Sequence, residues 1–333
     1  MSVMELNDDT HATMPVGGGS LDGEACLSML RQMSSQWWRR AQVKEEEMPV
    51  ELMFDRTRDD FLPELLPFNE HPDFWEAPPE LRSRALSCGW IAYNEKTIAI
   101  ESQIIGPACI DLLYRRLPGA DEASIRATAS ETLTDEAYHI LLTNNAVRAC
   151  EDNRDLRLRE LPEFALVREM EREMASHSEK WQRHVVQLAT AIVSEVFISD
   201  YLAQLSSARH IQPLNRLTVE AHRRDELAHS KIFRSLAARI YHSLSEREKA
   251  FFVEVLPKPV RWFADQELDV WQSMLAQIDF PGYEGIIRDC RNVAQWRLDR
   301  LDYSELEELA DELGILDSQH GVDSFGRAGL LRR

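Results

Sequence analysis

Apolar side chains recur every three or four positions along most of the chain, which is the spacing of one face of an α-helix. Prolines and glycines stand between the periodic segments: Pro118 and Gly119 follow the first long one, and Pro213 lies where the first turn of a helix tolerates proline. This pattern predicts an all-α protein. The expected helices cover residues 80–117, 122–154, 163–177, 179–209, 213–242, 245–255, 259–278, 283–299 and 304–313.

The two ends of the chain lack this spacing. Residues 1–22 are polar and contain glycine, so we expect a disordered tail, followed by an N-terminal extension over residues 23–59. The main domain is then expected to cover residues 60–315, with a C-terminal tail over residues 316–333.

The last expected helix carries signals at both of its ends. Ser304 and Glu307 have the spacing of a capping box, which satisfies the first free amides of a helix. Gly314 directly follows the final apolar residue, as a left-handed glycine stop does.

The N-terminal extension contains the amphipathic stretch CLSMLRQMSSQWWRRAQVK, with Trp37, Trp38, Arg39 and Arg40 near its end. Such a stretch can contact a membrane surface or dock its tryptophans on the main body. Two aromatic rings without a longer basic face bind lipid weakly, so the pattern favours docking.

The balance of charge narrows the classes of partner. With 38 basic and 57 acidic residues, the formal net charge of −19 repels nucleic acid and anionic lipid. The five cysteines form no C-x-x-C pair and suggest neither a disulfide framework nor a thiolate zinc site. The longest apolar segment, residues 185–198, is interrupted by polar side chains. We therefore expect a cytoplasmic protein that binds neither nucleic acid nor membrane.

Two glutamates stand in apolar surroundings. Glu101 lies in TIAIESQII and Glu195 in TAIVSEVFI, and Glu195 shares a helical stripe with Leu188, Ile192 and Leu202. Glutamate is almost never fully buried unless it is paired. Either a buried arginine or a metal ion must therefore compensate these charges.

Two E-x-x-H motifs supply further carboxylates together with imidazoles. One such motif is weak evidence, because about one is expected by chance in a chain of this composition. Their order says more, since separations of 35, 59 and 31 residues place each group on a different helix. The order along the chain is Glu101, then Glu136 with His139, then Glu195, then Glu226 with His229. Ferritin-like four-helix bundles build di-iron or di-manganese sites from this set, so we predict such a bundle with additional C-terminal helices.

His222 adds a third imidazole to the set. It precedes Glu226 by four residues and His229 by seven, so all three lie on one helix face. Two divalent cations would cancel the charge of four buried glutamates. Carboxylate and imidazole ligands without thiolate suit iron or manganese.

Asp135 and Asp225 directly precede the glutamates of the two motifs. They can accept the free ring N–H of a ligand histidine across the bundle, which would fix the ring. Alternatively they face solvent or pair with Arg223 and Arg224, as helix-surface charges often do.

Four segments resemble the p-aminobenzoate N-oxygenase family: WIAYNEKTIAIE (90–101), DEAYH (135–139), SEVFI (194–198) and HRRDELAH (222–229). The resemblance covers roughly residues 50–315, and the histidine at position 222 is its most specific mark. The metal ligands that it implies are Glu101, Glu136, His139, Glu195, His222, Glu226 and His229.

The resemblance also implies an activity. Members of this family use two iron ions (Fe²⁺/Fe³⁺) and O₂ to oxidise an aromatic amine through hydroxylamine and nitroso stages to a nitro compound. An external electron donor, a homodimer and a place in antibiotic or other natural-product biosynthesis are implied as well.

Candidate substrate contacts follow from the same resemblance. The p-aminobenzoate enzyme holds its substrate's carboxylate with an arginine near the C-terminal end, and Arg297 and Arg300 lie in that region here. Neither coincides clearly with it, so a larger biosynthetic arylamine is at least as plausible a substrate. Tyr93 and Asn94, about two turns before Glu101, either line the pocket or belong to the core.

Other functions are compatible with the same bundle. A desaturase or C-oxygenase would use similar ligands, since a fold does not fix the reaction. A radical-generating ribonucleotide reductase subunit would need a tyrosine near the metals, but Thr143 stands one turn after His139 and Tyr138 lies on a neighbouring face. An iron-storage protein would leave residues 245–333 unexplained.

Overall fold

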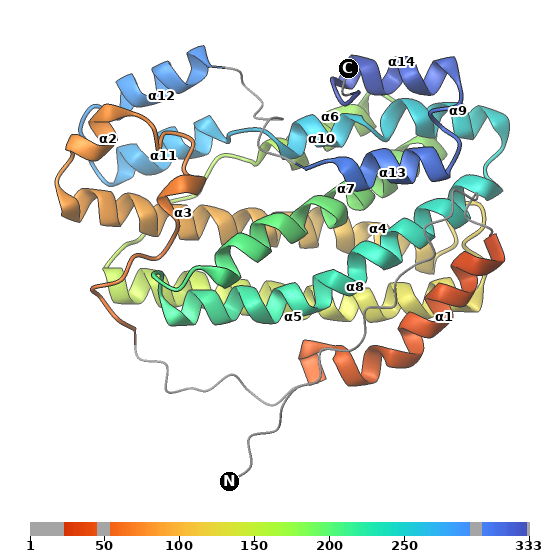
Figure 1. The fold of residues 1–333 in the computed structure, drawn as a ribbon, viewed down its shortest axis with the longest axis horizontal. Coiled ribbons are helices and arrows are strands. Elements are labelled where there is room, and N and C mark those ends of the chain that lie inside the picture. Colours follow the sequence, from red (N-terminus) through yellow and green to blue (C-terminus); the bar gives the residue numbers. More distant parts are fainter. Residues whose placement is uncertain (1–22, 45–53, 294–301, 332–333) are drawn as a thin grey trace, which may run out of the picture.

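The structure is a computed structural model that describes residues 23–44, 54–293 and 302–331. Within these ranges the chain forms helices and no β-strand, apart from one isolated parallel bridge between Asp59 and Ile211. The predicted fold class is confirmed: the protein is an all-α, ferritin-like bundle with additional C-terminal helices (Figure 1).

Four long helical segments make up the bundle. They are α3 (Pro79–Ile100), continued by η3 (Glu101–Ile105) and α4 (Gly106–Leu113); α5 (Ala123–Arg154); α7 (Lys180–Ser207); and α8 (Pro213–Ser243). Helix α7 packs along α8, while α3 and α4 pack along α5. The stripe expected around Glu195 does face the interior, because Leu188, Ile192 and Leu202 are buried.

Helix α7 is long and apolar enough, by length and composition, to cross a membrane. Its apolar window is entirely buried inside the protein, against α8 and other helices. The central helix of a bundle passes the same test of length and hydropathy, so this finding gives no positive support for a membrane span.

The N-terminal helix α1 (Gly23–Arg40) and the turn η1 (Gln42–Lys44) lie against α5 and α8, at the lower edge of the molecule in Figure 1. Leu30 is fully buried in this contact, and Trp37 is 5% exposed. Trp38 is 67% exposed. The expected docking on the main body is therefore confirmed for Trp37 and not for Trp38.

The remaining helices lie mostly on the opposite side of the bundle, over α3 and α7 (Figure 1). They are η2 (Pro63–Leu65), α2 (Pro72–Glu76), α6 (Ala165–Ala175), α9 (Glu246–Val255), α10 (Lys258–Phe263), α11 (Leu268–Gln277), α12 (Tyr283–Asn292), α13 (Ser304–Glu312) and α14 (Gln319–Ala328).

Three of the expected helices end at other residues in the structure than the sequence predicts. The first stops at Leu113 rather than at residue 117, and Arg115 follows with a φ of +55°. The helix expected over 259–278 is two helices, because Glu267 adopts a φ of +52°, which an α-helix does not contain; its carboxylate binds the Ala165 amide and Lys96. Helix α12 ends at Asn292, and the rest of the range expected to reach residue 299 lies largely outside the described residues.

The capping box expected at Ser304 is wrong. The N-cap is Tyr303, and the Ser304 amide, which Glu307 would accept in a capping box, donates to Asp302 Oδ1 at 3.0 Å. The glycine stop at Gly314 is confirmed by its φ of +66°.

The segment expected to be a C-terminal tail contains helix α14, which packs on α9 and fully buries Phe325. Its sequence, with two internal glycines, has a poor intrinsic helix propensity, so tertiary packing decides its structure.

Candidate metal centre

A π-helical turn carries Glu101 into the bundle. Helix α3 passes into η3 at Glu101, and the Gly106 amide donates to the Glu101 carbonyl. A Cβ atom at Gly106 would lie 3.0 Å from that oxygen, so glycine fits the close approach. Single π turns inside helices often occur at functional sites.

Pro107 follows directly after this turn, at the start of α4. Proline has no amide to donate to the carbonyl of Gln103. Gln187 of α7 supplies the missing donor, because its Nε2 lies 3.2 Å from the Gln103 oxygen and 2.8 Å from the Ile104 oxygen. The side chain of one bundle helix thus secures the turn in another.

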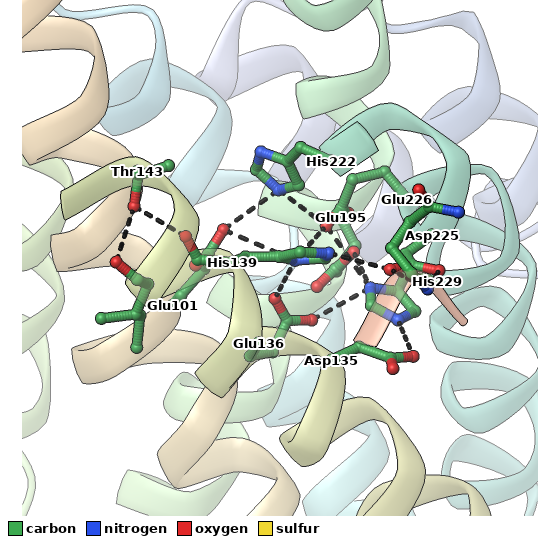
Figure 2. A network of polar contacts seen from close by, with 12 residues as sticks. Glu101, Asp135, Glu136, His139, Thr143, Glu195, His222, Asp225, Glu226 and His229 are labelled. Atoms are coloured by element: carbon green, nitrogen blue, oxygen red, sulfur yellow. Dashed lines mark hydrogen bonds and ion pairs between the residues drawn. The ribbon is translucent and has the colours of Figure 1, made fainter. Parts of the chain in front are cut away.

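The seven predicted ligands meet in the centre of the bundle, where each is at most 2% exposed (Figure 2). They form two groups, in each of which the possible ligand atoms lie within 4.8 Å of one another. The first ligand group is Glu101, His139, His222 and Glu226; the second ligand group is Glu136, Glu195, Glu226 and His229.

Short distances define the first ligand group. His222 Nε2 lies 3.0 Å from Glu101 Oε1 and 3.0 Å from Glu226 Oε1. His139 Nδ1 lies 3.3 Å from Glu226 Oε1 and 3.9 Å from Glu101 Oε1. Two imidazoles and two carboxylates therefore converge on one point.

The second ligand group has one imidazole. His229 Nδ1 lies 3.0 Å from Glu136 Oε1, 3.4 Å from Glu226 Oε1 and 4.0 Å from Glu195 Oε2. The other oxygen of Glu136 lies 3.1 Å from His139 Nδ1 in the first group. Glu136 and Glu226 therefore span both groups.

Several of these buried atoms lack a hydrogen-bond partner, although a charged atom lies nearby. They are both carboxylate oxygens of Glu101, Oε1 of Glu136, Oε2 of Glu195 and Nδ1 of His229. A buried polar atom without a partner is costly, typically by about 1–3 kcal/mol. Atoms that are close together but not aimed at one another suit ligands that share an ion, so the residues fit a pair of metal ions.

Burial and mutual repulsion also disfavour the metal-free ionised state. Burial raises the pKa of Glu101 to about 7. Burial, together with the carboxylates of Glu226 and Glu136, raises the pKa of Glu195 well above its ordinary value. Burial alone would lower the pKa of His229, but the surrounding carboxylates outweigh it and raise the pKa. Protons on Glu195 and His229 therefore compensate part of the buried negative charge in the metal-free chain.

Asp135 and Asp225 each contact the histidine of the other E-x-x-H motif, which lies on the facing helix (Figure 2). His139 Nε2 lies 3.2 Å from Asp225 Oδ2, and His229 Nε2 lies 3.2 Å from Asp135 Oδ2. Both aspartates are fully buried and do not face solvent. Each Nε2–H donates to an aspartate, which leaves Nδ1 directed at the glutamates.

Three residues of the N-terminal extension contact these aspartates, and sequence reasoning missed them. Trp37 Nε1–H donates to Asp135, the Gln42 amide donates to Asp225, and Arg40 lies near both. The tryptophan–arginine stretch was visible, but it is about a hundred residues from Asp135, so its partner could not be read from local spacing.

Comparisons with known proteins agree with the site. The family model for "P-aminobenzoate N-oxygenase AurF" matches residues 25–314. A 4-aminobenzoate N-oxygenase from Streptomyces thioluteus is 31% identical over 292 residues, which is 87% of each chain. The chain belongs to the p-aminobenzoate N-oxygenase family. The resemblance is thereby confirmed, and the chain is an oxygenase; the desaturase, radical-subunit and storage alternatives lose support.

In this family member an aromatic-lined cavity of about 170 Å³ borders the same helix as Glu101. Thr97 and Ile100 line it on α3, in the turn that leads to Glu101. Its aromatic lining residues are Phe61, Tyr93, Phe164, Phe263 and Trp271. Lys96 also lines it, with Nζ 2.7 Å from Glu267 Oε1.

The four candidate substrate contacts have different positions. Tyr93 lines the cavity, and its hydroxyl is buried without a hydrogen-bond partner. Asn94 is fully buried and its Nδ2 donates to the Trp90 carbonyl at 2.7 Å, so it packs inside the bundle. Arg297 and Arg300 lie outside the described residues.

Proposed function

We propose that this chain is a non-haem di-iron N-oxygenase that uses O₂ to oxidise an aminobenzoate-type arylamine through hydroxylamine and nitroso stages to a nitro compound. The observation that carries the proposal is the pair of buried ligand groups, in a chain of the N-oxygenase family. One iron ion would be held by the first ligand group and the other by the second, with Glu136 and Glu226 reaching both.

The side chains in and around the ligand groups support this chemistry in two ways. Glu226 belongs to both groups, and the second oxygen of Glu136 lies 3.1 Å from His139 of the first group, so both carboxylates would hold two ions close together. The buried apolar surroundings exclude water from the reacting centre. When bound, the iron pair supplies electrons that activate O₂.

The overall oxidation balances with a modest supply of external electrons. In the first stage, R–NH₂ with O₂, two electrons and two protons gives R–NHOH and water. In the second, R–NHOH with O₂ gives R–NO₂ and water, passing through the nitroso level. An external donor therefore has to deliver two electrons for each nitro group formed.

The aromatic-lined cavity is the proposed binding place of the amine. An engineered apolar cavity of about 150 Å³ in another protein binds benzene. The cavity of about 170 Å³ here is therefore suited to one aromatic ring. The Tyr93 hydroxyl and the Lys96 ammonium are polar groups that a ring substituent would meet, and Glu267 competes for the ammonium.

The test is a single-turnover reaction of the full chain. The metal-free protein is loaded with Fe²⁺ without air, mixed with p-aminobenzoate, and exposed to ¹⁸O₂. We expect hydroxylamino, nitroso and nitro products carrying ¹⁸O, detected by mass spectrometry. Protein that binds two iron ions yet converts neither p-aminobenzoate nor other simple arylamines would contradict the proposal.

We further propose a cytoplasmic enzyme of natural-product biosynthesis. All five cysteines are free in the structure, which suits a reducing compartment. The net charge of −19 disfavours nucleic-acid partners. The homodimer and the lack of a membrane partner stay predictions from the sequence.

A further inference from the structure

Helix α1 reaches the second ligand group through one buried aspartate. The Trp37 indole Nε1–H donates to both carboxylate oxygens of Asp135 at 2.9 Å. Asp135 Oδ2 in turn accepts from His229 Nε2 at 3.2 Å. All three side chains are buried. The N-terminal extension is thus joined to a ligand histidine by two consecutive hydrogen bonds.

A second series of hydrogen bonds leads from the turn η1 to the first ligand group. The Gln42 backbone amide donates to the two oxygens of Asp225 at 3.3 Å, and Asp225 Oδ2 accepts from His139 Nε2 at 3.2 Å. Each aspartate therefore takes one donor from the extension and one from a ligand histidine. The two series of hydrogen bonds lead to different ligand groups.

Arg40 lies between the two aspartates. Its Nη1 is 3.9 Å from Asp135 Oδ2 and 3.9 Å from Asp225 Oδ1. Both Nη1 and Nε are buried without a hydrogen-bond partner. At this distance the contact is electrostatic rather than a directed hydrogen bond. The Arg40 guanidinium therefore lies near both series of hydrogen bonds.

We propose that α1 and η1 are positioning elements of the metal centre, in which Trp37 and the Gln42 amide each fix one aspartate–histidine pair and Arg40 acts on both. This inference rests on the proposed di-iron function, because the orientation of the rings matters when their Nδ1 atoms bind ions. Outer hydrogen bonds hold a ligand ring in one tautomer, and their loss weakens metal affinity by about 10–100-fold.

The two ligand groups allow a selective test. Trp37→Phe keeps an aromatic ring but removes the indole N–H that Asp135 accepts. Because the contact is one step removed from the ligand, we expect about tenfold weaker binding, the lower end of that range, at the second group only. Arg40→Met should weaken both groups.

The experiment is a Co²⁺ titration of the metal-free full chain, followed by visible absorption and by ¹H NMR of the exchangeable imidazole N–H signals. The groups are distinguishable because the first holds two imidazoles and the second holds one. In Trp37→Phe the His229 N–H should exchange faster with solvent, while the His139 N–H should be unchanged.

Two further variants separate positioning from packing. Trp38→Phe makes the same change on the neighbouring ring, which is 67% exposed, and should bind Co²⁺ as the unaltered protein does. Leu30→Ala removes a fully buried apolar contact two turns before Trp37. It should lower the midpoint of thermal unfolding without favouring either ligand group.

Each outcome has a distinct meaning. Fewer than two Co²⁺ ions bound by the unaltered chain would contradict the proposed function itself. If the unaltered chain binds two ions and Trp37→Phe binds Co²⁺ as tightly as Trp38→Phe does, only the positioning role would be overturned. Equal weakening of both groups in Trp37→Phe and Leu30→Ala would also overturn it, because α1 would then act by packing alone.

Discussion

The three histidines present different ring nitrogens to the cluster. His139 and His229 direct Nδ1 at the glutamates and donate from Nε2 to an aspartate. His222 instead directs Nε2 at Glu101 and Glu226. The third imidazole belongs to the first ligand group alone, which makes the two groups chemically unequal.

Replacing His222 with alanine should therefore affect one group. We expect metal affinity at the first ligand group to fall by more than the roughly 10–100-fold that an outer contact contributes, because a direct ligand is lost. Stepwise Fe²⁺ binding and arylamine N-oxygenation measure the effect. His242→Ala, an exposed position on the same helix, is the control. Unchanged iron content and rate in His222→Ala would remove this residue from the ligand set.

Lys96 offers a test of how the substrate is oriented. Its ammonium lines the cavity and pairs with Glu267. Lys96→Met should raise KM about tenfold or more for p-aminobenzoate, since a charge-assisted contact contributes roughly 1.5–3 kcal/mol. KM for a neutral arylamine should change much less. Equal changes in KM for the charged and neutral amines would contradict a contact between Lys96 and the carboxylate of p-aminobenzoate.

At the scale of elements, the π turn η3 is held by a side chain from another helix. Gln187 of α7 donates to the carbonyls of Gln103 and Ile104, and Pro107 has no amide to donate to the first of these. This contact ties the element that carries Glu101 to the helix that carries Glu195.

Replacing Gln187 with leucine should remove the side-chain donor of both carbonyls, of which the Ile104 contact is buried. We expect the free energy of unfolding to fall by about 1–3 kcal/mol, measured by denaturant unfolding of the metal-free chain. Thr190→Val, which removes a hydroxyl that binds only within α7, is the matched control and should cost less. A loss no greater than that of Thr190→Val would show that the turn does not depend on Gln187.

The long helices could be predicted from the sequence because their apolar spacing extends over many turns. Their interruptions could not. The break at Glu267 depends on partners from α3 and α6, namely Lys96 and the Ala165 amide, and local spacing does not reveal these contacts. Helix α14 is similar, because burial of Phe325 on the main body compensates for a glycine-rich sequence.

In the whole molecule, the ligand groups lie in the bundle, and further helices pack on two of its sides. Helix α1 covers the side of α5 and α8, and the C-terminal helices cover α3 and α7 (Figure 1). The order of the carboxylates along the chain was sufficient to predict which residues meet. It could not predict the contacts of Trp37 and Arg40, because these join distant segments without a recurring spacing.

Removing the metal should destabilise the whole bundle, because ions that bind only the folded chain stabilise it by mass action. At a free Fe²⁺ concentration of about 100 times Kd, each ion contributes about 2.7 kcal/mol. We expect the midpoint of thermal unfolding to rise with Fe²⁺ under anaerobic conditions and to fall on chelation. A midpoint independent of metal concentration would contradict binding to the folded state.

Anomalous diffraction at the iron absorption edge, from crystals of the anaerobically loaded protein, tests the two proposed iron positions most directly. The proposed di-iron site predicts two peaks per chain, one among Glu101, His139, His222 and Glu226 and one among Glu136, Glu195, Glu226 and His229. No peak, a single peak, or peaks away from these side chains in crystals of fully loaded protein would contradict it.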